Sequence, residues 1–197
     1  KVKMRLKGDG LDHLQENKWS YRVQVKGDDQ IFGLRRFSLQ APWVRVFHGE
    51  ILFGETLRHV GVMAPRNFFV NVTVNGGKIG TMAVEEHFSK ELLEVQGRRE
   101  GVIAKFNDKR MWQAKLMGED FVQDGWTKDS YWSASIDPFR SSKIAKSEKL
   151  SSNLSTLVGL LRGFQKNELS ASEVFDVEQM GRFFAVVELW GAIHSIG

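Results

Sequence analysis

The sequence contains no cysteine and no long uninterrupted apolar run. Without cysteine, the protein cannot use a disulfide framework, a zinc site built from thiolates or a cysteine nucleophile. No stretch of about 20 apolar residues is present, so the sequence predicts no membrane-spanning helix. No signal peptide is recognisable. Because Lys1 is not a natural start, we expect the chain to be a cut fragment and any targeting segment to lie outside it.

Several common functional motifs are also missing. The sequence has no Walker-type Gly-Lys-Ser/Thr, no dinucleotide-binding fingerprint and no Gly-x-Ser-x-Gly elbow. These absences argue against P-loop, Rossmann and serine-hydrolase sites. The histidines show no spacing typical of metal ligands, so we predict no metal site among them. They are His13, His48, His59, His87 and His194.

What the sequence does contain is the composition of a folded globular protein. Its 197 residues are 42% hydrophobic, 26% charged and 11% aromatic, which is enough for a substantial core. This length allows one sizeable domain or two small lobes. The net charge of +4 fits phosphate or nucleotide binding, although so small an excess is common at this length. We predict no nucleic-acid binding, because no basic-aromatic module is recognisable.

The stretch 67–86 predicts a β-hairpin around which the rest of the chain is organised. Apolar and polar residues alternate from Phe68 to Val74, and Asn75-Gly76 supplies the positive φ angles of a tight turn. The second strand ends in two adjacent acids, Glu85 and Glu86, just before a predicted helix.

The register of this hairpin can be predicted from the apolar pattern. A two-residue turn would pair Val70 with Thr81, whereas a three-residue loop through Gly77 pairs Val70 with Met82 and keeps one apolar face together. A shift by one residue turns every side chain to the other face of a strand. We therefore expect the three-residue loop.

The other elements are predicted from the same periodicities. Strands are expected at Val2–Leu6, with a basic outer face, and at Lys18–Lys26, Arg36–Leu39, Val102–Phe106 and Met111–Met117. Helices are expected at Trp43–Val60, Phe88–Val95 and Leu150–Phe164, with a last helix beginning near Ser172. Apolar residues cover so much of the last helix that we expect it to be buried nearly all round.

Taken one at a time, the candidate functional residues have simple structural explanations. Lys7-Gly8-Asp9-Gly10 is a weak candidate for a phosphate loop and is more typical of a glycine turn. Lys105 fits a solvent-facing lysine in the middle of a strand, although strand lysines also bind nucleotide phosphates in kinases. Glu85 and Glu86 fit the acids that are common at helix N-termini.

Five segments in the same order resemble motifs of the spore-coat CotH kinase family, a group of atypical protein kinases. They are Arg5-Leu6-Lys7-Gly8 with Lys18-Trp19-Ser20-Tyr21-Arg22-Val23, Phe37-Ser38-Leu39-Gln40 with Gly61-Val62-Met63-Ala64-Pro65-Arg66, Val74-Asn75-Gly76 with Gly80-Thr81-Met82-Ala83-Val84-Glu85-Glu86, Gly101-Val102-Ile103-Ala104-Lys105, and Phe175-Asp176-Val177. By the spacing of the third segment, Glu86 is the motif acid, and we interpret Glu85 as a bystander. The resemblance covers most of the chain.

The resemblance implies an α+β, atypical protein-kinase-like fold. This fold would have an antiparallel small-lobe sheet with packed helices and the first helices of a large lobe. We expect a small-lobe-like region at 1–132, a connector at 133–149 and the start of the large lobe at 150–197. The family name suggests the spore coat, the cell envelope or the extracellular space as the location of the parent protein.

The resemblance also implies a function and a set of binding residues. The parent would transfer phosphate from ATP, with magnesium, to serine or threonine of a protein substrate. Lys105 would contact the nucleotide phosphates, with Lys18 and Arg22 near them. Glu86 would either pair with a lysine or mark the hinge between the lobes.

One departure from the family pattern affects the expected activity. In the family, the last helix leads into a loop with a catalytic aspartate and an asparagine, and then to a metal-binding aspartate. Here Gly191-Ala192-Ile193-His194 stands about where Gly-Asn-x-Asp is expected, with His194 near the aspartate position. Either the loop is shifted and the catalytic acid is expected beyond Gly197, or the acid is absent. In both cases the asparagine and the metal-binding aspartate are not in this chain, and we expect no kinase activity in this chain alone.

Two alternatives to the kinase fragment remain open. One is a pseudokinase-like scaffold that uses the fold only to bind other proteins. The other is a carbohydrate- or wall-associated domain, suggested by Trp112, Trp126 and Trp132. Packing or loop positions explain these tryptophans more simply.

Overall fold

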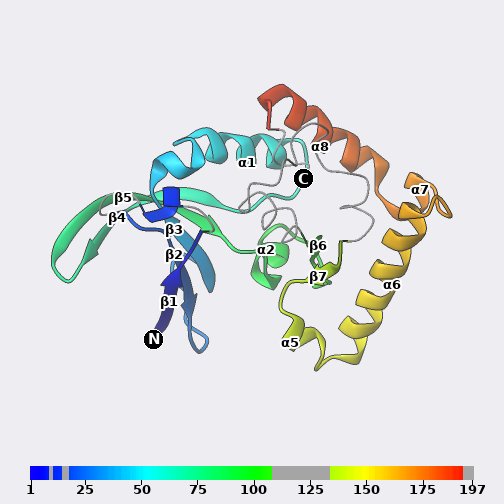
Figure 1. Cartoon of the computed structure of the whole chain (residues 1–197), viewed down its shortest axis with the longest axis horizontal. Coiled ribbons are helices and arrows are strands. Elements are labelled where there is room, and N and C mark those ends of the chain that lie inside the picture. Colours follow the sequence, from blue (N-terminus) through cyan, green and yellow to red (C-terminus); the bar gives the residue numbers. More distant parts are fainter. Residues whose placement is uncertain (9–10, 15–17, 108–133, 193–197) are drawn as a thin grey trace. The chain divides into compact units, whose positions relative to one another are not determined.

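The computed structural model describes residues 1–8, 11–14, 18–107 and 134–192, and it shows an α+β architecture (Figure 1). The chain divides into two compact units. The first unit contains Lys1–Arg99 and Gly181–Gly191, and the second is built on Glu100–Met180. The predicted α+β class is confirmed, while the kinase-like lobes remain a prediction.

The first unit contains a five-stranded antiparallel sheet with the strand order β1-β2-β3-β5-β4. Its strands match the predicted positions, because each carries an apolar residue at every second position. The buried side chains Val23, Val25, Leu34, Phe37 and Val84 form the core on one face. The strands are β1 (Val2–Leu6), β2 (Tyr21–Val25), β3 (Arg36–Gln40), β4 (Asn67–Val74) and β5 (Gly77–Glu86).

The β4–β5 hairpin extends past the other strands of the sheet (Figure 1). The predicted pairing of Val70 with Met82 is confirmed, but the three-residue loop is wrong. The turn is Asn75-Gly76, between Val74 and Gly77, and a β-bulge then leaves Ile79 without an opposite residue. This extra residue restores the register that keeps the apolar side chains on one face.

The helix expected over Trp43–Val60 is two elements. A short 3-10 helix, η2 (Pro42–Arg45), precedes α1 (Gly49–His59). Val46 and Phe47 lie between η2 and α1 and interrupt the helix, because both have left-handed backbone angles, with φ of 51° and 54°. Another 3-10 helix, η1, covers Leu11–Leu14, and α2 covers Lys90–Val95 within the predicted helix 88–95.

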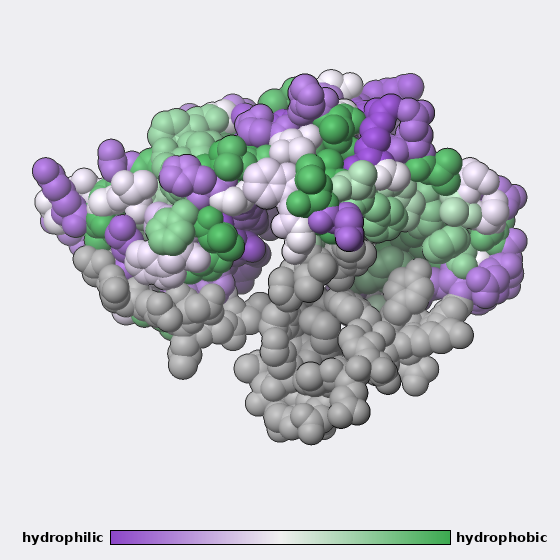
Figure 2. Space-filling view, turned by 90° about the horizontal axis from the view of Figure 1, so that it is seen from above, coloured by the Kyte–Doolittle hydropathy of each residue, from purple (hydrophilic) through white to green (hydrophobic). Residues whose placement is uncertain are grey.

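Large apolar side chains stay on the surface at the start of α1. Val46 is 78% exposed, and Phe47 and Leu52 are more than half exposed. Figure 2, which views the molecule from above, shows apolar and hydrophilic residues mixed on this surface. Leu57, on the same helix, is buried instead. Only one side of α1 therefore contributes to the core.

The described part of the second unit contains a two-stranded sheet, the helices α5, α6 and α7, and the start of α8. Strand β6 (Ala104–Phe106) pairs with β7 (Ile136–Pro138), and this pairing joins parts of the chain that we expected in different regions. The predicted helix 150–164 is confirmed as α6 (Glu148–Gln165), where the Ser147 hydroxyl caps the N-terminus by accepting from the Leu150 amide. The short helices are α5 (Ser141–Ile144) and α7 (Ala171–Val174).

The last helix, α8 (Val177–Trp190), is less buried than its composition predicts. Only Val186 and Val187 are buried among its described residues, and Leu189 is 77% exposed. Val186 packs with Leu57 in a second core cluster, so one narrow side of α8 is covered. The expectation of burial all round is therefore wrong for the residues that the structure describes.

Some predictions fall outside the described residues. These are the strand at Met111–Met117, the tryptophans Trp112, Trp126 and Trp132, and His194. None of the described helices is long and apolar enough to cross a membrane.

Candidate functional site

The sheet of the first unit has one apolar face and one polar face. Arg22 on β2 lies opposite Arg5 on β1 and Ser38 on β3, and Ser38 lies opposite Glu85 on β5. Because residues directly opposite share a face, these four side chains form a row across four strands. We call the surface that carries this row and its neighbouring rows the polar face.

Two further rows flank this one on the polar face. Lys3, Gln24 and Arg36 lie opposite one another on β1, β2 and β3. The row on the opposite side of the central row contains Ser20 and Gln40, which are completely buried. Ser38, in the central row, is only 3% exposed. Buried polar side chains need hydrogen-bond partners. The polar face is therefore a covered, hydrogen-bonding surface at one end and a cationic surface at the other.

At the covered end, an ion pair joins two residues that are 78 positions apart in the sequence, Lys7 and Glu85. Lys7 Nζ lies 2.5 Å from Glu85 Oε2 and also donates to Gln40 Oε1 at 3.1 Å. Gln40 Nε2 donates to the same Glu85 oxygen at 2.6 Å. The side chains of Lys7 and Glu85 are only 14% and 23% exposed. Hydrogen bonds between charged groups at such distances are strong and fix the orientation of both partners.

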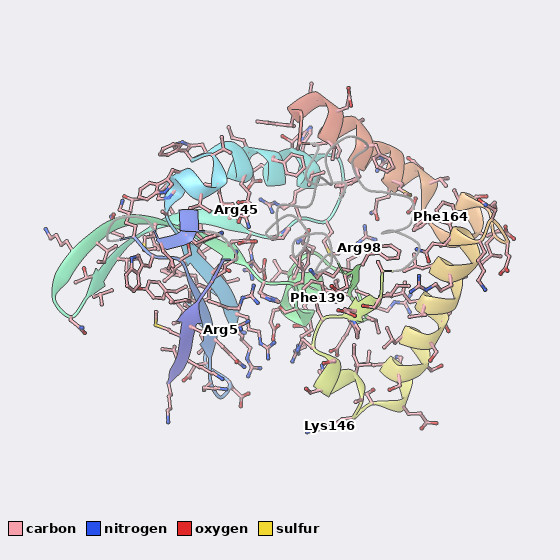
Figure 3. All side chains as sticks on the ribbon, in the orientation of Figure 1. Arg5, Arg45, Arg98, Phe139, Lys146 and Phe164 are labelled. Carbon is pink, nitrogen blue, oxygen red and sulfur yellow. The ribbon has the colours of Figure 1, made fainter. Side chains whose placement is uncertain are left out.

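A second cation and a second acid extend this pair into a charge cluster. Arg45, the last residue of η2, places Nη2 3.5 Å from Glu85 Oε2 and Nε 3.4 Å from Glu50 Oε2 on α1. Figure 3 labels Arg45 beside the sheet. The charge cluster therefore consists of Lys7, Gln40, Arg45, Glu50 and Glu85, drawn from strands, a 3-10 helix and a helix.

The charge cluster shifts the pKa values of its members in directions that follow from their neighbours. Burial alone would raise the pKa of the Glu85 carboxyl, but the charges of Lys7 and Arg45 and the hydrogen bonds lower it. Burial lowers the pKa of Lys7, with Arg45 and Arg22 adding to the effect against the attraction of Glu85. Burial raises the pKa of Glu50. Glu85 is thus the carboxylate that the cluster keeps ionised.

At its cationic end, the polar face contains a pocket of about 270 Å³. The side chains that line it come from three adjacent strands and from the residue after β5. We call it the basic pocket. Burial, together with the charges of Arg22 and Arg36, lowers the pKa of His87 in this pocket. Its described lining contains no carboxylate and consists of Lys3, Arg5, Arg22, Gln24, Arg36 and His87.

Glu86 belongs to the other face of the sheet. It lies opposite Phe37, and its side chain is 1% exposed. Arg66 donates from Nη2 to Oε1 at 2.7 Å and from Nε to Oε2 at 2.9 Å, and the Arg66 amide adds a third bond at 3.1 Å. The hydrogen bonds to Glu86 raise the pKa of Arg66. This bidentate pair fastens the start of β4 to the end of β5.

The structure places the four predicted binding residues in different surroundings. Lys18 donates to the Thr81 carbonyl at 3.2 Å and lies 5.6 Å from the Trp43 ring centroid. Arg22 lines the basic pocket, and Glu86 pairs with Arg66. Lys105 is on β6 in the second unit, opposite Asp137. A shared role of these residues in nucleotide binding remains a prediction.

The sequence did not indicate that five side chains would form the charge cluster, namely Lys7, Gln40, Arg45, Glu50 and Glu85. The interpretation of Glu85 as a bystander does not fit its contacts with Lys7 and Gln40. The signal in the sequence was the alternation of basic residues along β1, which gave that strand its predicted basic face. Only the register across the sheet shows which acid this face meets.

The described residues contain no group of three or more His, Asp or Glu side chains that could hold a metal ion. We therefore assign no magnesium ligand to this part of the chain.

Comparison with known proteins identifies the family. A family model described as CotH kinase protein matches residues 4–195, which is nearly the whole chain. A search of curated proteins found no match. The matched range includes the strands of the polar face except the first two residues of β1, together with the charge cluster and most of the second unit. The chain belongs to the CotH kinase protein family.

Proposed function

We propose that this chain forms the nucleotide-binding part of an ATP-dependent kinase that phosphorylates serine or threonine in a protein substrate. The family supports a kinase-like protein. The single observation that supports a nucleotide site most directly is the Lys7–Glu85 ion pair, with 2.5 Å between Nζ and Oε2, on the polar face. In protein kinases, a lysine on a strand contacts nucleotide phosphates while a glutamate holds it in place.

The polar face has the chemistry that a polyphosphate requires. Lys7 and Arg22 would neutralise charge on the phosphate oxygens, and Glu85 would orient the Lys7 ammonium group. Phosphoryl transfer depends mainly on positioning and on charge neutralisation. ATP would supply the phosphoryl group when bound. We derive no step through magnesium, because the described residues contain no suitable group of metal ligands.

The test separates two lysines that could contact the phosphates. Lys7 is proposed from its position, and Lys105 from the family resemblance. We would titrate ATP with magnesium into the whole chain by calorimetry, for the unaltered protein and for Lys7→Met, Lys105→Met and Lys78→Met. Lys78 is an exposed lysine near the hairpin turn and serves as the control.

We expect Lys7→Met to weaken ATP binding at least tenfold and Lys78→Met to change it less than twofold. If only Lys105→Met weakened ATP binding, the phosphate contact would be assigned to Lys105 on β6, and the role of Lys7 would be contradicted. No binding of ATP by the unaltered chain would contradict the proposed function itself.

A non-catalytic scaffold is the second candidate. The sequence Gly191-Ala192-Ile193-His194 in place of Gly-Asn-x-Asp favours it. Incubation with radiolabelled ATP and with casein as a general acceptor can contradict the scaffold, whereas the calorimetric titration of ATP distinguishes a nucleotide-binding fragment from a scaffold that binds no nucleotide. The scaffold, and our expectation for this chain alone, require no transfer of label. Transfer that Lys7→Met or Lys105→Met abolishes would establish a kinase.

A further inference from the structure

The basic pocket and the charge cluster meet at the central row of the polar face, where Arg5 and Arg22 lie in line with Glu85, and the pocket extends from there to the row of Lys3 and Arg36. The row of Lys3 and Arg36 is four residues along the strands from the row of Lys7 and Gln40. At about 3.3 Å per residue, this corresponds to roughly 13 Å. A triphosphate chain is shorter than this separation. Phosphates that contact Lys7 would therefore leave the row of Lys3 and Arg36 accessible to a second anion.

The charge of the basic pocket indicates what that anion is. Besides Arg22, which the proposed function assigns to the nucleotide phosphates, Lys3, Arg5 and Arg36 bring three basic side chains to this pocket of about 270 Å³. A single carboxylate neutralises only one of these charges, whereas a phosphate monoester carries between one and two negative charges and three acceptor oxygens. Arginine binds such groups through two parallel hydrogen bonds. The described lining offers no aliphatic side chain for a nucleobase, and its one ring is the imidazole of His87.

The position of the pocket indicates what carries the phosphate. Lys3 and Arg5 are exposed side chains of β1, and β1 is the edge strand of the five-stranded sheet. An edge strand has backbone groups that an extended peptide can pair with. Val2, Met4 and Leu6 on the other face of β1 are about half exposed, so a peptide beside β1 would cover them too.

We propose that the basic pocket binds a phosphorylated residue of an extended protein segment that lies along β1. That this segment belongs to the kinase substrate rests on the proposed function. The protein would then recognise a substrate that already carries a phosphate near the residue to be modified.

The test uses three fluorescein-labelled peptides that differ only in a central serine, phosphoserine or glutamate. Their binding to the whole chain is measured by fluorescence anisotropy at about 50 and 200 mM salt, with inorganic phosphate as a competitor. The informative variant is Lys3→Gln/Arg5→Gln, in which both altered side chains are exposed. The control, Lys78→Gln/Lys149→Gln, removes the same charge from exposed positions elsewhere.

We expect the phosphoserine peptide to bind at least tenfold more tightly than the serine peptide and than inorganic phosphate. Lys3→Gln/Arg5→Gln should weaken this binding at least tenfold, and the control less than threefold. Binding should weaken as salt increases. Equal loss in both variants, or equal binding of phosphoserine and serine peptides, would overturn the proposal. If the glutamate peptide bound as tightly as the phosphoserine peptide, the pocket would not be specific for phosphate. If inorganic phosphate bound as tightly as the phosphoserine peptide, the pocket would not recognise a peptide.

Titration of ATP with magnesium into the same variants separates this proposal from the proposed function. Unchanged ATP affinity in Lys3→Gln/Arg5→Gln, with loss of phosphopeptide binding, supports two sites. A parallel loss of ATP binding would make the pocket part of the nucleotide site and overturn the further inference alone. If the chain bound the phosphopeptide but not ATP, the proposed function would be contradicted and the phosphate-binding pocket would still be supported.

Discussion

Glu85 and Glu86 are adjacent in sequence, but their carboxylates lie on opposite faces of the sheet. Glu85 pairs with Lys7 on the polar face, whereas Glu86 pairs with Arg66 on the apolar face. The alternation of side chains along β5 explains the separation. The two acids therefore have different partners, and substituting each one tests a different feature of the protein.

Glu86→Gln should lower the free energy of unfolding by about 3 kcal/mol, because it leaves Arg66 without its buried carboxylate. Urea denaturation followed by tryptophan fluorescence measures the change. The control is Glu55→Gln, which breaks an exposed pair with Arg58 and should change the stability much less. Similar effects of the two substitutions would show that burial does not determine how much the Glu86–Arg66 pair stabilises the protein.

Glu85→Gln should make stability depend less on pH in the acidic range. The pKa of Glu85 is lowered below its ordinary 4.5, so its contribution is complete above that pH and is lost as pH falls through the folded-state pKa. The stability difference between the unaltered protein and the variant should therefore shrink from pH 7 to pH 3. Urea denaturation at each pH measures it.

Glu50→Gln supplies the opposite sign for comparison. Burial raises the pKa of Glu50, so ionising it costs stability as pH increases from about 4.5 through the higher folded-state value. The variant should gain stability relative to the unaltered protein over this range. Stability differences that stay constant with pH in both variants would contradict the assigned shifts.

Gly80→Ala should destabilise the hairpin by about 1–2 kcal/mol, because Gly80 has φ of +91° beside the β-bulge. Thermal unfolding gives the change. Gly159→Ala is the matched control, since it lies inside α6 with no atom within 4 Å of the added methyl. It should stabilise the helix by up to about 1 kcal/mol. A loss of stability at Gly159 equal to that at Gly80 would rule out the backbone explanation.

Leu57→Ala should lower the free energy of unfolding by roughly 3 kcal/mol, because the Leu57 side chain on α1 is buried against Val186 of α8 in the second core cluster. Leu52→Ala on the same helix removes the same atoms from a side chain that is half exposed, and it should cost less than about 1 kcal/mol. Denaturant unfolding of both variants compares them directly. Equal costs would contradict the packing of α8 on this side of α1.

Local patterns in the sequence predicted a large part of the fold. Alternation located the strands of the five-stranded sheet, and the spacing of leucines located α6. The pairing of Val70 with Met82 also followed from the sequence, because both strands of a hairpin are local and only one register joins their apolar faces. The turn length did not follow, since a bulge at Ile79 changes the register within the strand.

The sequence by itself determined the strand pattern, the amphipathic helix, the basic face of β1 and the family to which the chain belongs. Only the tertiary structure decided that Lys7 meets Glu85, which lies 78 positions away. It also decided that Glu86 faces Arg66, that Val46 and Phe47 interrupt a helix, and that one narrow side of α8 is buried. The reason is physical. Periodicity fixes which side chains share a face of one element, whereas the register and packing of distant elements fix what that face meets.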